Sequence, residues 1–231
     1  VVCAAGGAVI LNGAINTGSG GLYVHTAGIV TLNATLTATG SVGPGWDGTL
    51  RMGANGDLPD ATLMILGDAS SGGYGVWDLN GVSQTIGGLT NASANAANEV
   101  KSATTATLTV NDGSSRTFGG KLTGAGLSLV KSGAGTFTLS NTANTYSGNT
   151  TISGGALRLG ASGVIPDGSG KGDVTVNGTL DLGGYSETIN GLSGSGTVDN
   201  SLGSGTYTLT VGGDNDTMSF GGTVTDTAGS L

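Results

Sequence analysis

Charged and sulfur-containing side chains are scarce in this sequence of 231 residues. Charged residues make up 10% of the chain, and there is one cysteine, Cys3, one histidine, His25, and three prolines. A single cysteine cannot form an internal disulfide, so we interpret Cys3 as a small buried apolar residue. The net charge of −8 argues against nucleic-acid binding, which needs a basic stripe.

Long apolar runs are missing as well. No run approaches the ~20 residues that a membrane-spanning helix needs, so we expect no membrane insertion in this segment. The sequence has neither an initiating methionine nor a signal peptide with a basic start. We infer that it is part of a longer chain.

Aromatic residues are few, at 4%, whereas glycine is abundant, with 48 residues. Collagen is excluded because the glycines do not recur at every third position. A disordered chain would carry more charge and fewer β-branched residues. The sequence therefore indicates an ordered fold with a core of leucine, valine, isoleucine and alanine, as thin stacked coils would have.

Residues 126–160 show the pattern most clearly. Phe137 and Leu139 flank Thr138, and Leu157 and Leu159 flank Arg158. A period of two places the apolar residues on one face of a strand and the polar residues on the other. Glycine-rich turns at 132–135 and 153–155 separate the strands, and glycine permits tight corners because it tolerates positive φ.

This stretch resembles the autotransporter-associated β-strand repeat of bacterial secreted passengers. The matching positions are Lys131, Gly133, Gly135, Thr136, Leu139, residues 144–148, residues 150–152, Gly155, Leu157, Leu159 and Gly160. The sequence departs from the family pattern at residues 141–143, where the family has a shorter link with a glycine. The resemblance implies a right-handed parallel β-helix exported to the outside of a bacterial cell, and it implies no particular ligand.

Internal repeats extend this architecture to the whole sequence. Residues 47–60 align with 154–167, and residues 76–89 align with 179–192, with eight of 14 positions identical in each case. We divide the chain into the tail of a preceding repeat (1–20), a first large repeat (21–123) and a second (124–231). These repeats, each of roughly 105 residues, form one continuous solenoid because neighbouring units bury one another's inner faces.

A shorter rhythm predicts the coils. Short strands centre near Thr138, Arg158, Asp181, Val198 and Thr225, about one β-helix coil apart. We predict an all-β right-handed parallel β-helix of about ten coils. Residues 43–45 and 91–103 are expected to be loops, and four Asn-Gly pairs, at 12–13, 80–81, 177–178 and 190–191, are expected at corners with positive φ.

Three residues are candidates for catalysis. His25 would have to serve any Ser–His–Asp triad, but its counterpart in the next repeat is Ser132, which favours ordinary repeat variation. Asp78 and Asp181 could form a glycosidase pair, yet they hold equivalent positions in different repeats. We therefore place both in solvent, with Leu180 and Leu182 in the core, and expect Asp181→Ser to cost less than about 0.5 kcal/mol.

Two further features could bind a ligand. Residues 212–216 resemble a calcium loop in their oxygen-bearing side chains, but they lack the downstream glutamate and the nonapeptide period. Whether Asp214, Asn215 and Asp216 bind calcium stays open, with a polar turn as the simpler interpretation. Tyr146, Tyr185, Trp46 and Trp77 could form a carbohydrate platform if exposed, although Trp77 replaces Leu180 at an inferred core position.

The sequence therefore predicts a non-enzymatic β-solenoid at a bacterial cell surface or outside the cell, acting as a stalk or an adhesin. We assign it no catalytic, cofactor-binding or metal-binding residue. Expected partners are surface glycans or proteins of a host or of bacteria, or other copies of the chain, and not nucleic acid. Two alternatives stay open: a self-assembling extracellular fibre subunit, and a β-helical carbohydrate-active lyase or hydrolase, since such enzymes share the fold.

Overall fold

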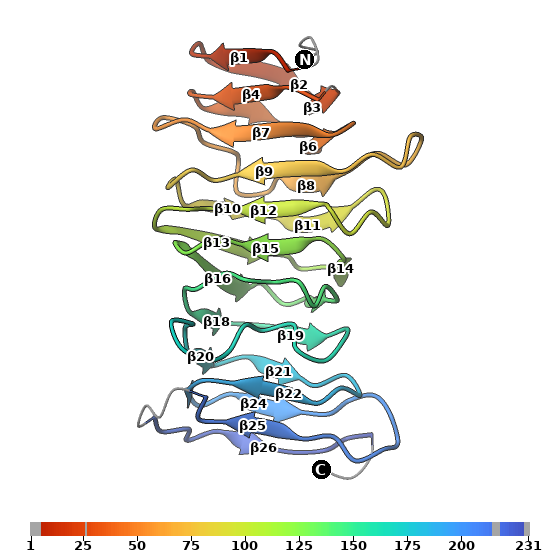
Figure 1. Ribbon diagram of the computed structural model, residues 1–231, viewed down its shortest axis with the longest axis vertical. Helices are drawn as coiled ribbons and strands as arrows, with labels where there is room; N and C mark the ends of the chain where they lie inside the picture. Colours follow the sequence, from red (N-terminus) through yellow and green to blue (C-terminus); the bar gives the residue numbers. More distant parts are fainter. Residues whose placement is uncertain (1–5, 26, 214–217, 229–231) are drawn as a thin grey trace.

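The computed structural model describes residues 6–25, 27–213 and 218–228. These ranges hold 26 short β-strands, stacked as rungs along one axis from the N-terminal end to the C-terminal end (Figure 1). Every hydrogen-bonded pair among these strands is parallel. The predicted all-β solenoid of about ten coils is confirmed.

The strands line three faces of the solenoid, each visited once per coil. Face 1 holds β1 (Ala8–Leu11), β4 (Ile29–Leu32), β7 (Gly48–Met52), β9 (Gly75–Asp78), β12 (Glu99–Lys101) and β15 (Lys121–Thr123), and later β22 (Glu187–Ile189) and β25 (Leu209–Val211). Face 2 holds β2 (Ile15–Gly18) and β5 (Leu36–Ala38), then β10 (Gln84–Ile86), β13 (Ala106–Asn111), β16 (Leu127–Ser132), β18 (Thr150–Ile152), β20 (Val174–Val176) and β23 (Leu192–Ser193). Face 3 holds β3 (Leu22–His25), β6 (Val42–Gly45), β8 (Leu63–Leu66) and β11 (Gly88–Asn91), then β14 (Arg116–Phe118), β17 (Thr136–Leu139), β19 (Ala156–Leu159), β21 (Thr179–Asp181), β24 (Thr197–Asp199) and β26 (Thr223–Val224).

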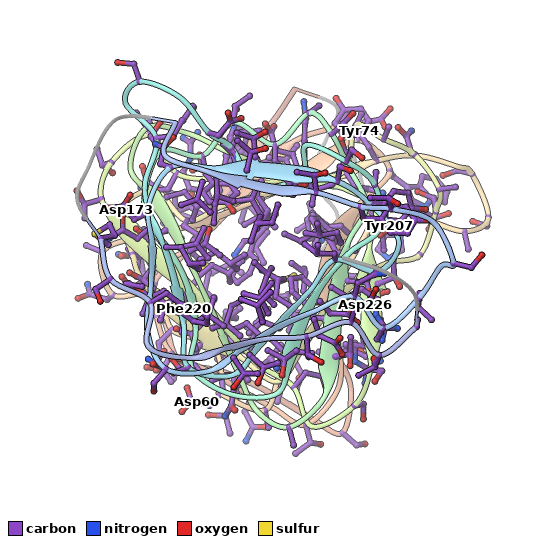
Figure 2. The ribbon with its side chains drawn as sticks, turned by 90° about the horizontal axis from the view of Figure 1, so that it is seen from below. Asp60, Tyr74, Asp173, Tyr207, Phe220 and Asp226 are labelled. Carbon is purple, nitrogen blue, oxygen red and sulfur yellow. The ribbon has the colours of Figure 1, made fainter. Side chains whose placement is uncertain are left out.

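The cross-section is a triangle whose interior is filled by side chains (Figure 2). Asp173, Tyr207 and Asp60 lie near its three corners, in the turns that connect one face to the next. Each strand spans only two to six residues, because the chain must turn soon to reach the next face. A coil this narrow cannot bury its own inner face, so each coil depends on its neighbours.

Inward-facing residues form ladders of apolar side chains. On face 3, Leu157, Leu180 and Val198 occupy the same register position in successive coils, and each is at most 1% exposed. On face 1, Leu50 and Trp77 stack in the same way, and Trp77 is fully buried. The predicted core positions Leu180, Leu182 and Trp77 are thus confirmed. Burial of this apolar surface is the main favourable contribution to folding.

The short rhythm in the sequence corresponds to successive rungs of one face. The strands centred near Thr138, Arg158, Asp181 and Val198 are β17, β19, β21 and β24, which are hydrogen-bonded neighbours on face 3. The fifth, predicted near Thr225, is β26, which pairs with β24. Counting residues between similar short strands therefore gave the coil length.

The long sequence repeat does not correspond to a whole number of coils. Residues 47–60 and 154–167 are equivalent in sequence, but β7 of the first segment lies on face 1 and β19 of the second lies on face 3. The same change of face separates β9 from its equivalent, β21. The repeat thus spans between four and five coils, and equivalent residues point in different directions around the axis.

Two local predictions were wrong. Residues 43–45 belong to strand β6 and not to a loop, and part of the expected loop at 91–103 is strand β12. Among the Asn-Gly pairs, only Asn80 and Gly81 both have positive φ, at 49° and 84°. Asn190 has a different role, because its buried amide clamps a turn by binding Gly168 N and the carbonyl oxygens of Gly168 and Lys171 at 2.7–3.0 Å.

Removal of one inward side chain should cause local damage. We expect Leu180→Ala to lower the free energy of unfolding by about 2–5 kcal/mol, because it leaves a cavity in a stack that cannot collapse. Hydrogen exchange should rise in residues 155–200 more than in residues 30–60, because coils contact mainly their neighbours. Thr138→Ala, on the outer face of β17, is the control and should cost at most about 0.5 kcal/mol; equal costs would contradict the register.

Candidate functional site

A groove crosses face 3 near the N-terminal end of the solenoid. It has a volume of about 420 Å³ and is lined by residues of β3, β6, β8 and the segments after β8 and β11: Tyr23, His25, Gly45, Ile65, Gly67, Asp68, Ala69 and Ala92. Tyr23 and His25 are in register with Gly43 and Gly45 of β6. Because both outward positions of β6 are glycine, the backbone of β8 and of the segment after it packs closely against β6, and Gly45 lines the groove without a side chain.

The close approach of β8 to β6 requires glycine in β6. A Cβ atom at Gly43 would lie 1.8 Å from the carbonyl oxygen of Ile65, and one at Gly45 would lie 3.0 Å from that of Gly67. No real Cβ contact is as short as the first of these, so residue 43 must be glycine. Pro44 is tolerated inside the strand because β8 pairs with β6 only at Val42 and Met64, so its missing N–H breaks no ladder bond there.

Three rings lie side by side along the rim of the groove. The ring centroids of Tyr23 and His25 are 5.8 Å apart with planes at 60°, and those of His25 and Trp46 are 5.8 Å apart with planes at 62°. Tyr23 is 38% exposed and Trp46 is 47% exposed. Such tilted contacts are a favourable arrangement of aromatic rings, and they make one continuous faceted surface. We call Tyr23, His25, Gly45, Trp46 and Asp68 the aromatic groove.

Trp46 is held in place by an unusual backbone turn. Trp46 and Asp47 both have positive φ, at 54° and 61°, a conformation that costs a non-glycine residue of order 1–3 kcal/mol. Hydrogen bonds to the next coil fix the turn: Asp47 N donates to Tyr74 O at 2.8 Å, and Tyr74 N donates to the Asp47 carboxylate at 3.1 Å. Backbone strain of this kind concentrates at functional sites.

Asp68 forms the opposite side of the aromatic groove. Its Oδ1 accepts hydrogen bonds from Ser70 Oγ at 2.6 Å and from the backbone N–H groups of Ser70 and Ser71 at 2.8 Å. These bonds, with the Ser70 hydroxyl foremost and the Trp46 indole N–H among them, hold the pKa of Asp68 well below its usual range. Asp68 is therefore ionised at neutral pH.

His25 is not positioned as the base of a Ser–His–Asp triad. Its ring contacts are with Tyr23 and Trp46, and the serine hydroxyl nearest to the acid, that of Ser70, donates directly to Asp68. In a triad the imidazole lies between the serine and the acid. His25 therefore belongs to an aromatic surface.

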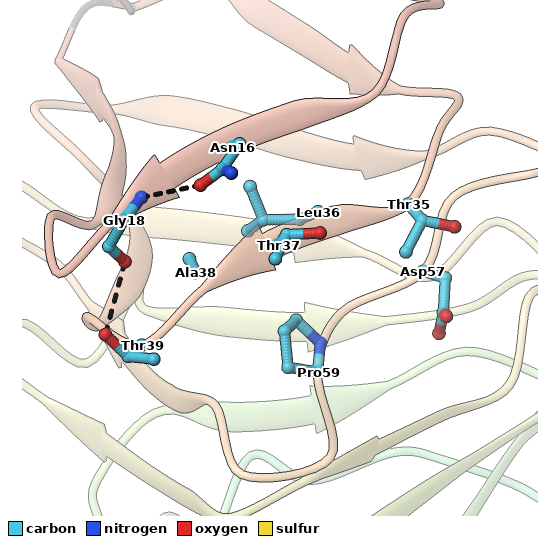
Figure 3. A pocket seen from close by; sticks show the side chains of 9 residues that line it. All are labelled: Asn16, Gly18, Thr35, Leu36, Thr37, Ala38, Thr39, Asp57 and Pro59. Atoms are coloured by element: carbon cyan, nitrogen blue, oxygen red, sulfur yellow. Dashed lines mark hydrogen bonds between the residues drawn. The ribbon is translucent and has the colours of Figure 1, made fainter.

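A second pocket, also of about 420 Å³, lies over β2 and β5 on face 2 (Figure 3). Its lining mixes polar side chains, such as Asn16, Thr37 and Thr39, with the apolar side chains of Leu36, Ala38 and Pro59. Asn16 Oδ1 accepts a bond from Gly18 N at 2.9 Å, and Thr39 Oγ1 donates to Gly18 O at 3.2 Å. These groups serve local structure, and aromatic side chains do not line this pocket.

The prediction that Asp78 and Asp181 lie in solvent was wrong. Asp78 is 7% exposed and Asp181 is 2% exposed. Both occupy outward register positions, as expected, but an arginine of the preceding coil covers each one. Arg51 Nε lies 2.9 Å from Asp78, and Arg158 Nε lies 2.7 Å from Asp181.

Asp181 accepts more hydrogen bonds than an ion pair alone would provide. Ser201 donates from its N–H at 3.0 Å and its hydroxyl at 2.6 Å, and Gly183 N donates at 3.0 Å. Burial would raise the pKa of Asp181, but the bonds from Ser201, Arg158 and Gly183 outweigh it and lower the pKa. Arg51 and Arg158 occupy the same position in the alignment of the two repeats. This shared arginine was the signal in the sequence for a structural ion pair with the aspartate.

Glu187 and its equivalent Gln84 are buried clamps that the sequence analysis missed. Glu187 accepts hydrogen bonds from the N–H groups of Gly163, Val164 and Ile165 at 2.8–3.3 Å. Gln84 accepts one from Leu58 N at 3.0 Å, and Leu58 is the repeat equivalent of Ile165. Each side chain thus holds the turn of the preceding coil. The neutral amide of Gln84 has this role in the first repeat, and the carboxylate of Glu187 has it in the second.

The carboxylates Glu187 and Asp167 share a pocket of about 250 Å³, which makes them the strongest pair for acid–base chemistry. Burial raises the pKa of Glu187, against the effect of its backbone hydrogen bonds. However, both oxygens of Glu187 already accept backbone N–H groups, and its residue is 3% exposed. Neither oxygen is left to face a substrate, so Glu187 is a structural residue.

Two residues of the resembling motif are also buried for structural reasons. Lys131 is fully buried, and its ammonium donates to the carbonyl oxygens of Ser132, of Gly133 at 2.9 Å and of Gly154 at 3.4 Å. Burial lowers the pKa of Lys131, and the charge of Asp112 partly opposes this. Tyr146 is 1% exposed and bonds to Thr150 Oγ1 at 2.8 Å, so it cannot belong to a carbohydrate platform.

The calcium question falls on Asp214, Asn215 and Asp216, which lie outside the described residues, as does Cys3. Elsewhere in the described ranges, no group of three or more His, Cys, Asp or Glu side chains is arranged to hold a metal ion. In the same ranges no helix has the length and apolarity to cross a membrane.

Comparison with known proteins adds a family to this geometry. Residues 129–159, which run from β16 to β19, match the family described as passenger-associated-transport-repeat. The chain is also 39% identical over 82 residues to the adhesin BmaC autotransporter of Brucella suis biovar 1 (strain 1330). No solved structure matches the chain significantly.

The two matches confirm an autotransporter passenger repeat in this chain, as the sequence indicated. The aligned part covers 36% of this chain and 2% of the relative. The chain thus corresponds to a small part of that protein's length.

Removal of the Asp181 carboxylate should be more costly than the sequence suggested. We now expect Asp181→Ser to lower the free energy of unfolding by about 2–3 kcal/mol, since the donors from Arg158 Nε, Ser201 and Gly183 lose the carboxylate that accepts their hydrogen bonds. Urea unfolding would measure this. The same substitution at exposed Asp60 is the control, with an expected cost of at most about 0.5 kcal/mol; equal costs would show that the buried pair is unimportant.

Glu187 should make stability depend on pH. Its pKa in the folded state lies above the ordinary value of 4.5, so its favourable contribution is complete below pH 4.5 and is lost as pH rises through the folded-state pKa. We expect Glu187→Gln to remove this loss of stability at higher pH, because Gln84 shows that a glutamine side chain fits at the equivalent position of the first repeat. The difference in unfolding free energy between wild type and Glu187→Gln should therefore change between pH 4.5 and neutrality, and a constant difference would refute the assignment.

Proposed function

We propose that this chain is a segment of an autotransporter passenger, displayed outside a bacterial cell, which acts as a spacer and adhesive surface without catalysis. The transport repeat at 129–159 supports export, and its strands continue the same sheets as the rest of the solenoid. The similarity to an autotransporter adhesin supports adhesion.

The observation that carries the non-enzymatic assignment is the use of the buried carboxylates. Asp78, Asp181 and Glu187 each bind groups of a neighbouring coil, and Asp112 binds Arg116 within its own turn at 2.6 Å. A glycosidase needs two carboxyl groups that both face the substrate. The pair of Glu187 and Asp167 does not meet this requirement, because both carboxylate oxygens of the buried Glu187 accept backbone hydrogen bonds.

Surface location can be tested on intact bacteria that carry the complete passenger. We expect an antibody raised against residues 21–225 to label intact cells, and added protease to remove the label without lysis. The antibody against a cytoplasmic protein is the control. Labelling that appears only after lysis would refute display outside the cell.

Adhesion can be tested with the same strains. An in-frame deletion of residues 21–225, with surface expression matched through a tag elsewhere in the passenger, should reduce attachment of the bacteria to host cells. Unchanged attachment would leave the spacer role and exclude the adhesive one. Cleavage of polysaccharides by the purified segment, abolished by Glu187→Gln, would favour the enzyme alternative instead.

A further inference from the structure

We propose that the aromatic groove binds a neutral pyranose sugar at the end of, or within, a surface glycan. This inference rests on the proposed function, because it names the ligand class of the displayed segment. It starts from the distribution of aromatic side chains. The chain has few of them, and Trp77, Tyr146, Phe118 and Phe137 are buried. Tyr23 and Trp46 are instead exposed, and each contacts the ring of His25.

The repeat shows that packing does not demand this exposure. In the alignment of the two large repeats, Tyr23 corresponds to Val130, His25 to Ser132, and Trp46 to Ser153. Asp47 corresponds to Gly154, which does not have positive φ. The solenoid is therefore built in the second repeat without the aromatic rings and without the strained turn. Among the residues that the structure describes, the aromatic groove occurs once, as a binding site would.

The shape of the groove suits a sugar ring. Ligand sites are concave, largely apolar and oriented by a few polar groups, and a volume of about 420 Å³ is enough for one or two pyranose units. Each pyranose has a face of C–H groups that can pack on the electron-rich face of an aromatic ring. Gly45 lines the groove without a side chain.

The charge of the groove selects a neutral ligand. Asp68 is ionised and can accept hydrogen bonds from sugar hydroxyl groups, whereas its charge and the net charge of −8 repel uronic and sialic acids. An aromatic cage for a quaternary ammonium ion is built from rings that surround the ion. The ring centroids of Tyr23, His25 and Trp46 lie 5.8 Å apart from one ring to the next, so these rings pack on each other and do not form such a cage.

The test uses purified protein and the fluorescence of Trp46, since Trp77 is fully buried and should not respond. The probes are the neutral disaccharides lactose, maltose and cellobiose. Glucuronic acid and choline chloride represent the two alternative ligand classes, an acidic sugar and a quaternary ammonium ion. We expect at least one neutral disaccharide to shift the emission saturably with a millimolar dissociation constant, and Tyr23→Ala to weaken that binding at least about tenfold.

Tyr185→Ala is the matched control, because Tyr185 is also 38% exposed and lies far along the chain; it should bind sugar as wild type does. Urea unfolding verifies that Tyr23→Ala is folded, and His25→Ala is a second groove variant if it is not. Three results would overturn the proposal: no response to any neutral sugar, a stronger response to glucuronic acid or choline, or equal loss in Tyr185→Ala. Sugar binding in solution by a protein that is not displayed on cells would refute the proposed function and leave the groove assignment intact.

Discussion

The hydrogen-bonded register between successive coils is the constraint on which the rest of this structure depends. Parallel pairing fixes which residue of one coil lies above which residue of the next, and a slip of one residue would turn every inward side chain outward. The ladder of Leu157, Leu180 and Val198 exists because their strands keep this register. Polar groups obey it too, since Arg158 meets Asp181 only at this alignment.

The fold was predictable because its signals are local and repeated. Alternation around Thr138 and Arg158 identified strands, and the distance between similar strands identified coils. The burial of Asp181 was not predictable in this way, because an outward position is exposed or covered according to side chains 20 or more residues away. The identical arginines of the two repeats carried the information, but sequence alone did not say that they meet the acids.

The aromatic groove was missed for a related reason. Glycine and proline at 43–45 usually interrupt strands, and only the solenoid shows that β6 keeps its pairing to β3 while its pairing to β8 is nearly absent. His25 and Trp46 were considered separately in the sequence, as a catalytic candidate and as a scattered aromatic. Their contact depends on the turn at Trp46 and Asp47, whose positive φ values no residue type there predicts.

The mismatch between the sequence repeat and the coil affects how such rods meet one another. If equivalent segments always returned to the same face, the same side chains would recur in a straight line along the rod. Two rods could then associate side by side along their length. Here β7 and β19, and likewise β9 and β21, return on different faces, so any strip is interrupted after a few coils. A long passenger built on this rule would present its repeated features in a spiral, which disfavours lateral bundling of neighbouring molecules and leaves every side of the rod able to meet a target.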